Sequence, residues 1–171
     1  AGPAGTSGRT PRGGSGHGAV GHRLARAVST FADASAVVKL YADETGHACV
    51  RAVDTMVVSQ LTRVEVASAL SRKHRLGELQ RPALHALLAD FEADYFGTDE
   101  EPPRFVVVAL TAEVVEEAAR VVRVHGLRAS DAVQLASALA VRRVDARCDT
   151  FLAFDQDLVG AASAEGFTCL P

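Results

Sequence analysis

The apolar positions along the chain alternate between short continuous runs and longer stretches with helical spacing. Continuous runs rich in β-branched and aromatic residues predict strands, whereas apolar residues three and four positions apart predict helices. Strands are predicted at residues 30–32, 56–59, 105–109, 151–154 and 167–170. Helices are predicted between them, at residues 35–43, 46–54, 60–75, 79–94, 112–124, 129–142 and 156–164.

This order of elements favours an α/β fold with a mostly parallel sheet. Strands that are apolar throughout and separated by helices are typical of sheets covered on both faces, so we expect a three-layer α/β/α sandwich. A length of 171 residues with 48% hydrophobic residues suits one domain, which we place at residues 30–171. Such sheets bind ligands beyond the carboxyl ends of their strands.

The first 29 residues differ in composition from the rest of the chain. They hold eight of the 14 glycines and four arginines, with no acidic residue and no hydrophobic period. This composition predicts a disordered Gly/Arg-rich extension. We expect the natural start to lie near Val28, so that removing residues 1–27 leaves folding and activity intact.

Composition narrows the class of protein further. No apolar run approaches the ~18 residues of a membrane span, and no signal-peptide block is evident, which predicts a cytoplasmic protein without a membrane segment. The three cysteines never form a Cys-x-x-Cys pair, which argues against a disulfide framework and a zinc site. The net charge of −3 is not that of a typical nucleic-acid binder, so contact with a polyanion would depend on local arginines or metal ions.

Four carboxylates lie at positions where the fold would bring them together. Asp33 directly follows the first predicted strand, and Asp155 follows the strand at 151–154 in the same way. Asp131 begins the helix at 129–142, and Glu65 lies among apolar residues on the helix at 60–75. Because the strand ends converge in such a fold, we expect these side chains to meet.

Each of these acids also has a purely structural explanation. Asp33 and Asp155 could cap the helices that follow them, and Ser130 or Asp131 could cap the helix at 129–142. Glu65 could form an ion pair with Arg63 at a partly exposed edge. From position and spacing alone, both explanations stay open for each residue.

A shared explanation is a metal site for hydrolysis of a phosphodiester bond. Four carboxylates in one partly desolvated cleft repel one another, and divalent cations relieve that repulsion. Mg²⁺ and Mn²⁺ prefer such hard oxygen ligands. Two ions about 4 Å apart can orient a water and stabilise both the attacked phosphorus and the leaving oxygen.

Four segments, taken in order, resemble the PIN-domain nucleases, and specifically the VapC-type ribonuclease toxins of toxin–antitoxin pairs. They are DASAVVKLY at 33–41, LTRVEVASAL at 61–70, HGLRASDAVQLASALA at 125–140 and FLAFDQDL at 151–158. The resemblance implies an endoribonuclease that requires Mg²⁺ or Mn²⁺, acts on RNA, forms a homodimer and is inhibited by a cognate antitoxin protein. The catalytic and metal-binding acids of the family fall on Asp33, Glu65, Asp131 and Asp155.

The chain departs from the family pattern beside the last acid. Ala153 stands where many members have Thr or Ser, which could weaken water positioning. Asp157 stands where some members have a basic residue, and as a first-turn acid it could simply complement the helix dipole.

Further contacts can be proposed from position. Arg63, Arg123 and Arg128 lie near the acids in sequence, as candidates for RNA phosphate contact or as ordinary solvated arginines. The helical pair at 60–75 and 79–94 could form a groove for the antitoxin or could simply pack into the core.

Two other functions compete with a nuclease. One is a PIN-like module that has lost catalysis and binds RNA or protein; RNA binding without metal-dependent cleavage would favour it. The other is a phosphoacceptor receiver domain, which needs paired acids at its first strand and a late lysine, whereas the only lysines here are Lys39 and Lys73.

Overall fold

The computed structural model describes residues 29–42 and 44–170. The predicted extension at 1–29 and the proposed start near Val28 therefore lie outside the described residues, except for Ser29. The strands are β1 (Thr30–Ala32), β2 (Met56–Ser59), β3 (Phe105–Val108), β4 (Thr150–Leu152) and β5 (Thr168–Leu170). The helices are α2 (Ala34–Tyr41), α3 (His47–Arg51), α4 (Thr62–Arg75), α5 (Arg81–Phe96), α6 (Ala112–His125), α7 (Ala129–Val144) and α8 (Gln156–Ala164).

Every predicted strand and helix is present. The predictions at 30–32, 56–59 and 156–164 match β1, β2 and α8 at both ends, and the other elements have at least one shifted end. The strand predicted at 151–154 is shorter because β4 pairs with the three residues of β1, from Thr30 with Thr150 to Ala32 with Leu152. The helix predicted at 46–54 ends earlier, at Arg51, because the chain must extend again before β2.

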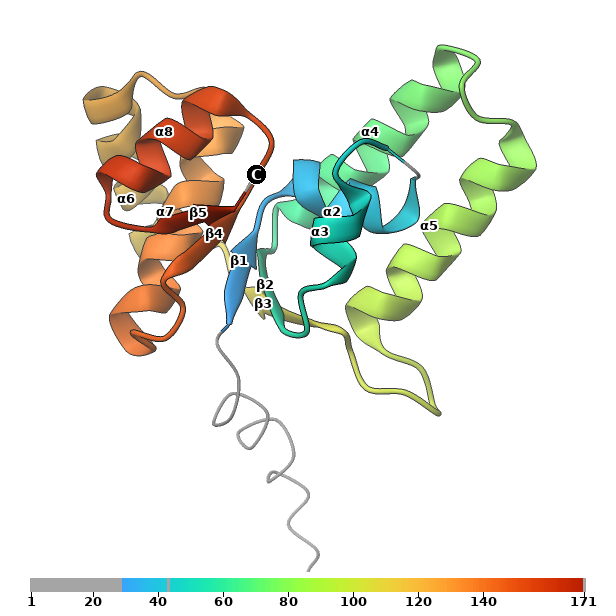
Figure 1. The fold of residues 1–171 in the computed structure, drawn as a ribbon, viewed down its shortest axis with the longest axis horizontal. Coiled ribbons are helices and arrows are strands. Elements are labelled where there is room, and N and C mark those ends of the chain that lie inside the picture. Colours follow the sequence, from blue (N-terminus) through green and yellow to red (C-terminus); the bar gives the residue numbers. More distant parts are fainter. Residues whose placement is uncertain (1–28, 43, 171) are drawn as a thin grey trace, which may run out of the picture.

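The sheet is parallel throughout, in the order β3-β2-β1-β4-β5 (Figure 1). The chain builds outward from β1 through β2 to β3, then crosses to the other side of β1 for β4 and β5. The connections after β1 and β4 therefore leave in opposite directions. In parallel α/β sheets this switch point opens a crevice at the carboxyl ends of the two strands, where ligands bind.

Helices cover both faces of the sheet, which confirms the three-layer sandwich (Figure 1). Alternate residues of the central strands contribute to separate cores. Phe31 and Phe151 stack at 5.4 Å between ring centroids and pack on the side of α6, α7 and α8. Ala32 and Leu152 face the opposite core, against α2, α4 and α5. Both cores thus fix β1 and β4, the strands that end at the crevice.

Coverage is incomplete at the edge strand β3. Its Val107 is 37% exposed, so the covering layer ends before this edge of the sheet. Among the described residues, no helix combines the length and apolar character that crossing a membrane requires.

Candidate active site

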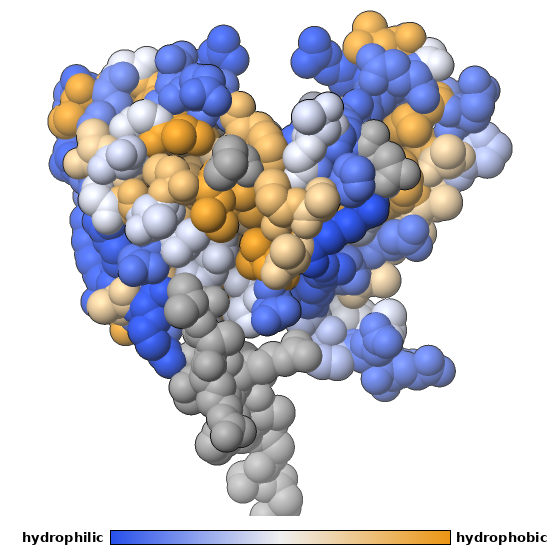
Figure 2. Space-filling model, viewed as in Figure 1, coloured by the Kyte–Doolittle hydropathy of each residue, from blue (hydrophilic) through white to orange (hydrophobic). Residues whose placement is uncertain are grey.

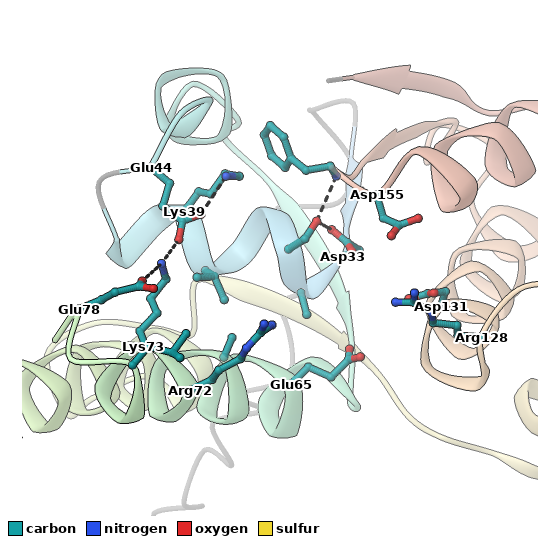
Figure 3. A pocket seen from close by; sticks show the side chains of 16 residues that line it. Asp33, Lys39, Glu44, Glu65, Arg72, Lys73, Glu78, Arg128, Asp131 and Asp155 are labelled. Atoms are coloured by element: carbon teal, nitrogen blue, oxygen red, sulfur yellow. Dashed lines mark hydrogen bonds and ion pairs between the residues drawn. The ribbon is translucent and has the colours of Figure 1, made fainter.

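A cavity of about 650 Å³ opens at the carboxyl ends of the strands, and all four predicted acids line it. The space-filling view shows hydrophilic side chains on both sides of a hollow above the strand ends (Figure 2). Asp33, Glu65, Asp131 and Asp155 approach this hollow from four different elements (Figure 3). Residues up to 122 positions apart in the chain therefore share one cavity.

Asp33 lies between β1 and α2 and caps the helix, as one of its explanations predicted. Its Oδ1 accepts hydrogen bonds from the backbone N–H of Ala36 at 3.0 Å and from Ser35 Oγ at 2.7 Å. The residue is only 5% exposed. Burial raises the pKa of Asp33 to about 6, although the hydrogen bonds from Ser35 and Ala36 oppose this shift. The cap stabilises the helix, but it leaves the carboxylate without a cation.

Asp155 repeats this arrangement after β4. Its Oδ1 accepts from the backbone N–H groups of Asp157 and Leu158 at 3.0 Å each, so it caps α8. Ser35 links the two acidic corners, because its Oγ also accepts a hydrogen bond from the Phe154 N–H at 3.0 Å. One hydroxyl thus connects the β1 and β4 ends of the crevice.

Glu65 projects from α4 and is held by a side chain of α7. Gln134 Nε2 donates to Glu65 Oε2 at 2.5 Å and to Thr62 Oγ1 at 3.0 Å. Burial raises the pKa of Glu65, and the charge of Asp131 adds to the shift.

The pairing of Glu65 with Arg63, one of its possible explanations, is wrong. Only one face of α4 packs inward, since Val64 next to Glu65 is 65% exposed. Arg63 pairs with Glu92 at 2.9 Å and does not pair with Glu65.

Asp131 lies in the first turn of α7 and does not cap the helix. The N-cap position is Arg128, and no side chain caps this end, so the capping explanation is wrong for both Ser130 and Asp131. Burial raises the pKa of Asp131, with a further contribution from Asp155, while Arg128 acts in the opposite direction.

Electrostatic repulsion connects the four acids in series. Glu65 raises the pKa of Asp33, Asp131 raises that of Glu65, and Asp155 raises that of Asp131. Hard carboxylate oxygens in this number fit Mg²⁺ or Mn²⁺ chemically. Across residues 29–42 and 44–170, however, no three His, Cys, Asp or Glu side chains are close enough to form a ready-made metal cluster. Mg²⁺ usually takes one or two protein carboxylates and several waters, so the fit does not require three direct ligands.

Residues in and behind the cavity wall were missed in the sequence. Gln134, which does not line the cavity but donates to Glu65, lies three residues after Asp131. Arg72, which lines the cavity, lies seven residues after Glu65 on the same helical face. Helical spacing from the predicted acids could have found both. Lys39, Lys73 and Glu44 also line the cavity, and no local pattern marks them.

Of the three arginines considered for RNA contact, only Arg128 lines the cavity. Arg63 is held by Glu92 and stacks on Phe96, with its guanidinium carbon 4.7 Å from the ring centroid. Arg123 is exposed on α6, outside the cavity.

The structure also shows where the two residues that depart from the family pattern, Ala153 and Asp157, lie. Ala153 is fully buried in the core and does not line the cavity. The hydroxyl beside Asp33 comes from Ser35 instead. Asp157 is exposed in the first turn of α8 and lines a smaller cavity of about 310 Å³ next to Asp131 and Asp155.

The sequence matches the PIN domain family over residues 30–162. Two curated relatives come from Mycobacterium tuberculosis: Ribonuclease VapC45 of strain CDC 1551 / Oshkosh and Ribonuclease VapC49 of strain ATCC 25618 / H37Rv. Each is 41% identical over 120 residues, which cover 65% of this chain and 75% of the relative.

The fold is similar to a solved toxin structure. The crystal structure of Mycobacterium tuberculosis VapC20, described as a sarcin-ricin loop cleaving toxin, matches with a TM-score of 0.56. The match covers 81% of this chain and 96% of the other, at 22% identity. This likeness concerns the fold alone, and it agrees with a PIN-like sandwich rather than a receiver domain.

Proposed function

We propose that this chain, which belongs to the PIN domain family, is a VapC-type endoribonuclease toxin whose activity requires Mg²⁺ or Mn²⁺. One observation carries the site assignment. Asp33, Glu65, Asp131 and Asp155 line one cavity at the switch point of the sheet, and within the described part of the chain none of them forms an ion pair. Carboxylates that share a cavity without an ion-pair partner cost stability, so a ligand that needs negative charge is the simplest reason for them.

The four acids are proposed to have different roles, because their hydrogen-bond partners differ. Asp33 and Asp155 are held rigidly by helix-capping bonds and by Ser35, so they are proposed to fix the ligand positions for the metal. Asp131 is proposed to contribute from α7, directly or through a water bound to the metal. A bound Mg²⁺ or Mn²⁺ supplies Lewis-acid stabilisation of the phosphate and lowers the pKa of water.

Glu65 is proposed to ligate the metal or to accept the proton of the attacking water. Burial raises the pKa of Glu65 toward neutral pH, and a pKa closer to the working pH suits a general base. The bond from Gln134 fixes which way the carboxylate faces.

We further infer that an antitoxin protein inhibits this chain in the cytoplasm and that it forms a homodimer, as its family implies. The antitoxin groove expected between α4 and α5 gains little support, because most apolar residues of these helices pack into the core. Leu84 is buried, and Leu79, Leu87 and Leu88 pack partly buried against the same core. Leu76 is the exception, at 62% exposed.

Cleavage of a labelled single-stranded RNA tests the proposed activity. We expect cleavage that excess EDTA stops and Mn²⁺ restores, and we expect Asp33→Asn to abolish it while the protein stays folded. RNA binding without metal-dependent cleavage would favour the inactive PIN-like module.

A further inference from the structure

The cavity has an acidic half and a second half that is basic and apolar. The acidic half contains the four carboxylates. The second half lies between α2 and α4. Its cations are Lys39, Arg72 and Lys73, beside the acids Glu44 and Glu78, and its apolar residues are Val38, Ala69 and Leu76. A substrate that enters the cavity therefore contacts an acidic surface and one with an excess of one positive charge.

The two lysines of the basic half are already neutralised by glutamates. Lys39 pairs with Glu44 at 2.9 Å, and Lys73 pairs with Glu44 and, at 3.2 Å, with Glu78. This series joins α2 to the end of α4 (Figure 3). The lysines thus hold the wall of the cavity together, and their charges are largely cancelled.

Arg72 differs from these lysines. In the part of the chain that the structure describes, its side chain has neither an ion pair nor a hydrogen bond. It is exposed, and it extends from α4 toward the middle of the cavity on the side of Glu65 (Figure 3). The position is two helical turns beyond Glu65, on the face that carries the acid.

An RNA substrate needs a cation at this place. Each phosphate that approaches the four carboxylates is repelled by them, and the net charge of −3 offers no general attraction. An arginine with free N–H groups can bind a phosphate through two parallel hydrogen bonds. Lysines that are committed to Glu44 cannot do so without losing their own partner.

We propose that Arg72 binds the RNA phosphate next to the scissile one, so that the basic half of the cavity holds a nucleotide flanking the cleaved bond. Val38, Ala69 and Leu76 supply apolar surface beside it for the sugar and base. This inference rests on the proposed function, because it assumes that the acidic half holds the scissile phosphate.

Binding of a short fluorescein-labelled single-stranded RNA, measured by fluorescence anisotropy, tests the proposal. The measurement uses full-length Asp33→Asn protein in EDTA, so that no cleavage occurs. Adding Arg72→Ala should weaken binding about tenfold and make the dependence on salt less steep by about 0.7 in log–log slope, as expected for the loss of one phosphate contact. Arg72→Lys should restore part of the affinity.

Arg75→Ala is the matched control, since Arg75 is an exposed arginine of the same helix that does not line the cavity. It should leave affinity and salt dependence unchanged. In the cleaving protein, Arg72→Ala should raise KM more than it lowers kcat. Equal effects of Arg72→Ala and Arg75→Ala, or no effect of either, would overturn the proposal.

The two proposals can fail separately. If the wild-type protein does not cleave RNA with Mn²⁺ but Arg72→Ala still weakens RNA binding, the nuclease function fails and the phosphate site stands. If the protein cleaves RNA and Arg72→Ala changes neither KM nor binding, the phosphate site fails alone.

Discussion

Two groups of carboxylates in this molecule have opposite electrostatic surroundings. The first consists of Glu117 and Glu165, which connect α6, α7 and the end of α8 through ion pairs. Glu117 pairs with Arg120 at 2.8 Å and Arg143 at 3.0 Å, and Glu165 pairs with Arg120 at 2.9 Å and His125 at 2.8 Å. Hydrogen bonds from these partners, Arg120 for Glu117 and His125 for Glu165, hold the pKa of each glutamate below its usual value.

The second group lines the cavity and has no such partners within the described residues. Burial raises the pKa of Asp33, Glu65 and Asp131, and the acids reinforce one another. Paired acids favour the folded state, whereas unpaired acids oppose it. The comparison shows that the first group is stabilised by ion pairs and the second is not, which supports the proposal that the second group binds a ligand.

The largest expected effect is on catalysis. Asp33→Asn should lower RNA cleavage on the order of a thousandfold or more, because it removes a charge from the proposed metal site and leaves the helix cap in place. Glu165→Gln is the matched variant from the paired group, and it should cleave at the wild-type rate. Cleavage rates with Mn²⁺ at pH 8 measure both. Full activity of Asp33→Asn would remove the distinction between the two groups.

The next effect concerns stability and has opposite signs in the two groups. Asp33 has a folded pKa of about 6 against an ordinary value of 3.8, so its contribution to stability is lost as the pH rises through that interval. Asparagine cannot ionise. Asp33→Asn should therefore raise the free energy of unfolding at pH 8 by up to about 3 kcal/mol and change it little at pH 4.

Glu165 follows the reverse rule. Its folded pKa is lowered, so its contribution is present above the ordinary value of 4.5 and is lost as the pH falls through the folded pKa. Glu165→Gln should cost about 1 kcal/mol at pH 8. Urea denaturation in EDTA at pH 8 and pH 4 measures both variants. If Asp33→Asn is less stable than the wild type at pH 8, the ionised Asp33 carboxylate does not destabilise the fold, and the account of an unpaired buried acid is contradicted.

A smaller effect is expected from the residue that orients Glu65. Gln134→Met should lower cleavage about tenfold, because it removes the donor to Glu65 and keeps the volume of a buried side chain. Ser137→Ala is the control, since Ser137 is buried on the same helix but bonds to Ser59 and to the Val133 carbonyl. Steady-state cleavage kinetics decide this comparison, and an equal loss in both variants would mean that Gln134 acts only through the packing of α7.

The sequence predicted most of the fold because the core follows local periodicity. Phe31 and Phe151 lie in short apolar runs that can be recognised without knowing what they contact. The strand order was not predictable, because the position of β4 beside β1 depends on pairing between residues 120 positions apart. The ends of elements such as β4 differ from the prediction because they too depend on pairing with distant strands.

The site residues easiest to predict were the acids that lie between a strand and the helix after it. Asp33 and Asp155 each lie between a strand and the helix that follows it, so the parallel-sheet pattern placed both at the carboxyl edge without knowledge of the strand order. Helical spacing puts Gln134 and Arg72 on the faces of the predicted acids, but their proposed roles depend on tertiary contacts: Gln134 reaches Glu65 from another helix, and Arg72 faces a cavity formed by distant segments. The ion pairs of Glu44 with Lys39 and Lys73 depend likewise on tertiary contacts.

The central claim is that the four unpaired carboxylates share a site for a divalent cation, and Mn²⁺ titration by calorimetry tests it most directly. The wild-type protein and Glu165→Gln should bind Mn²⁺ at pH 8, with affinity that falls as the pH is lowered through about 6, where protons compete for Asp33. Asp33→Asn should bind much more weakly. Equal Mn²⁺ affinity in all three proteins, or no binding to the wild type, would contradict the account.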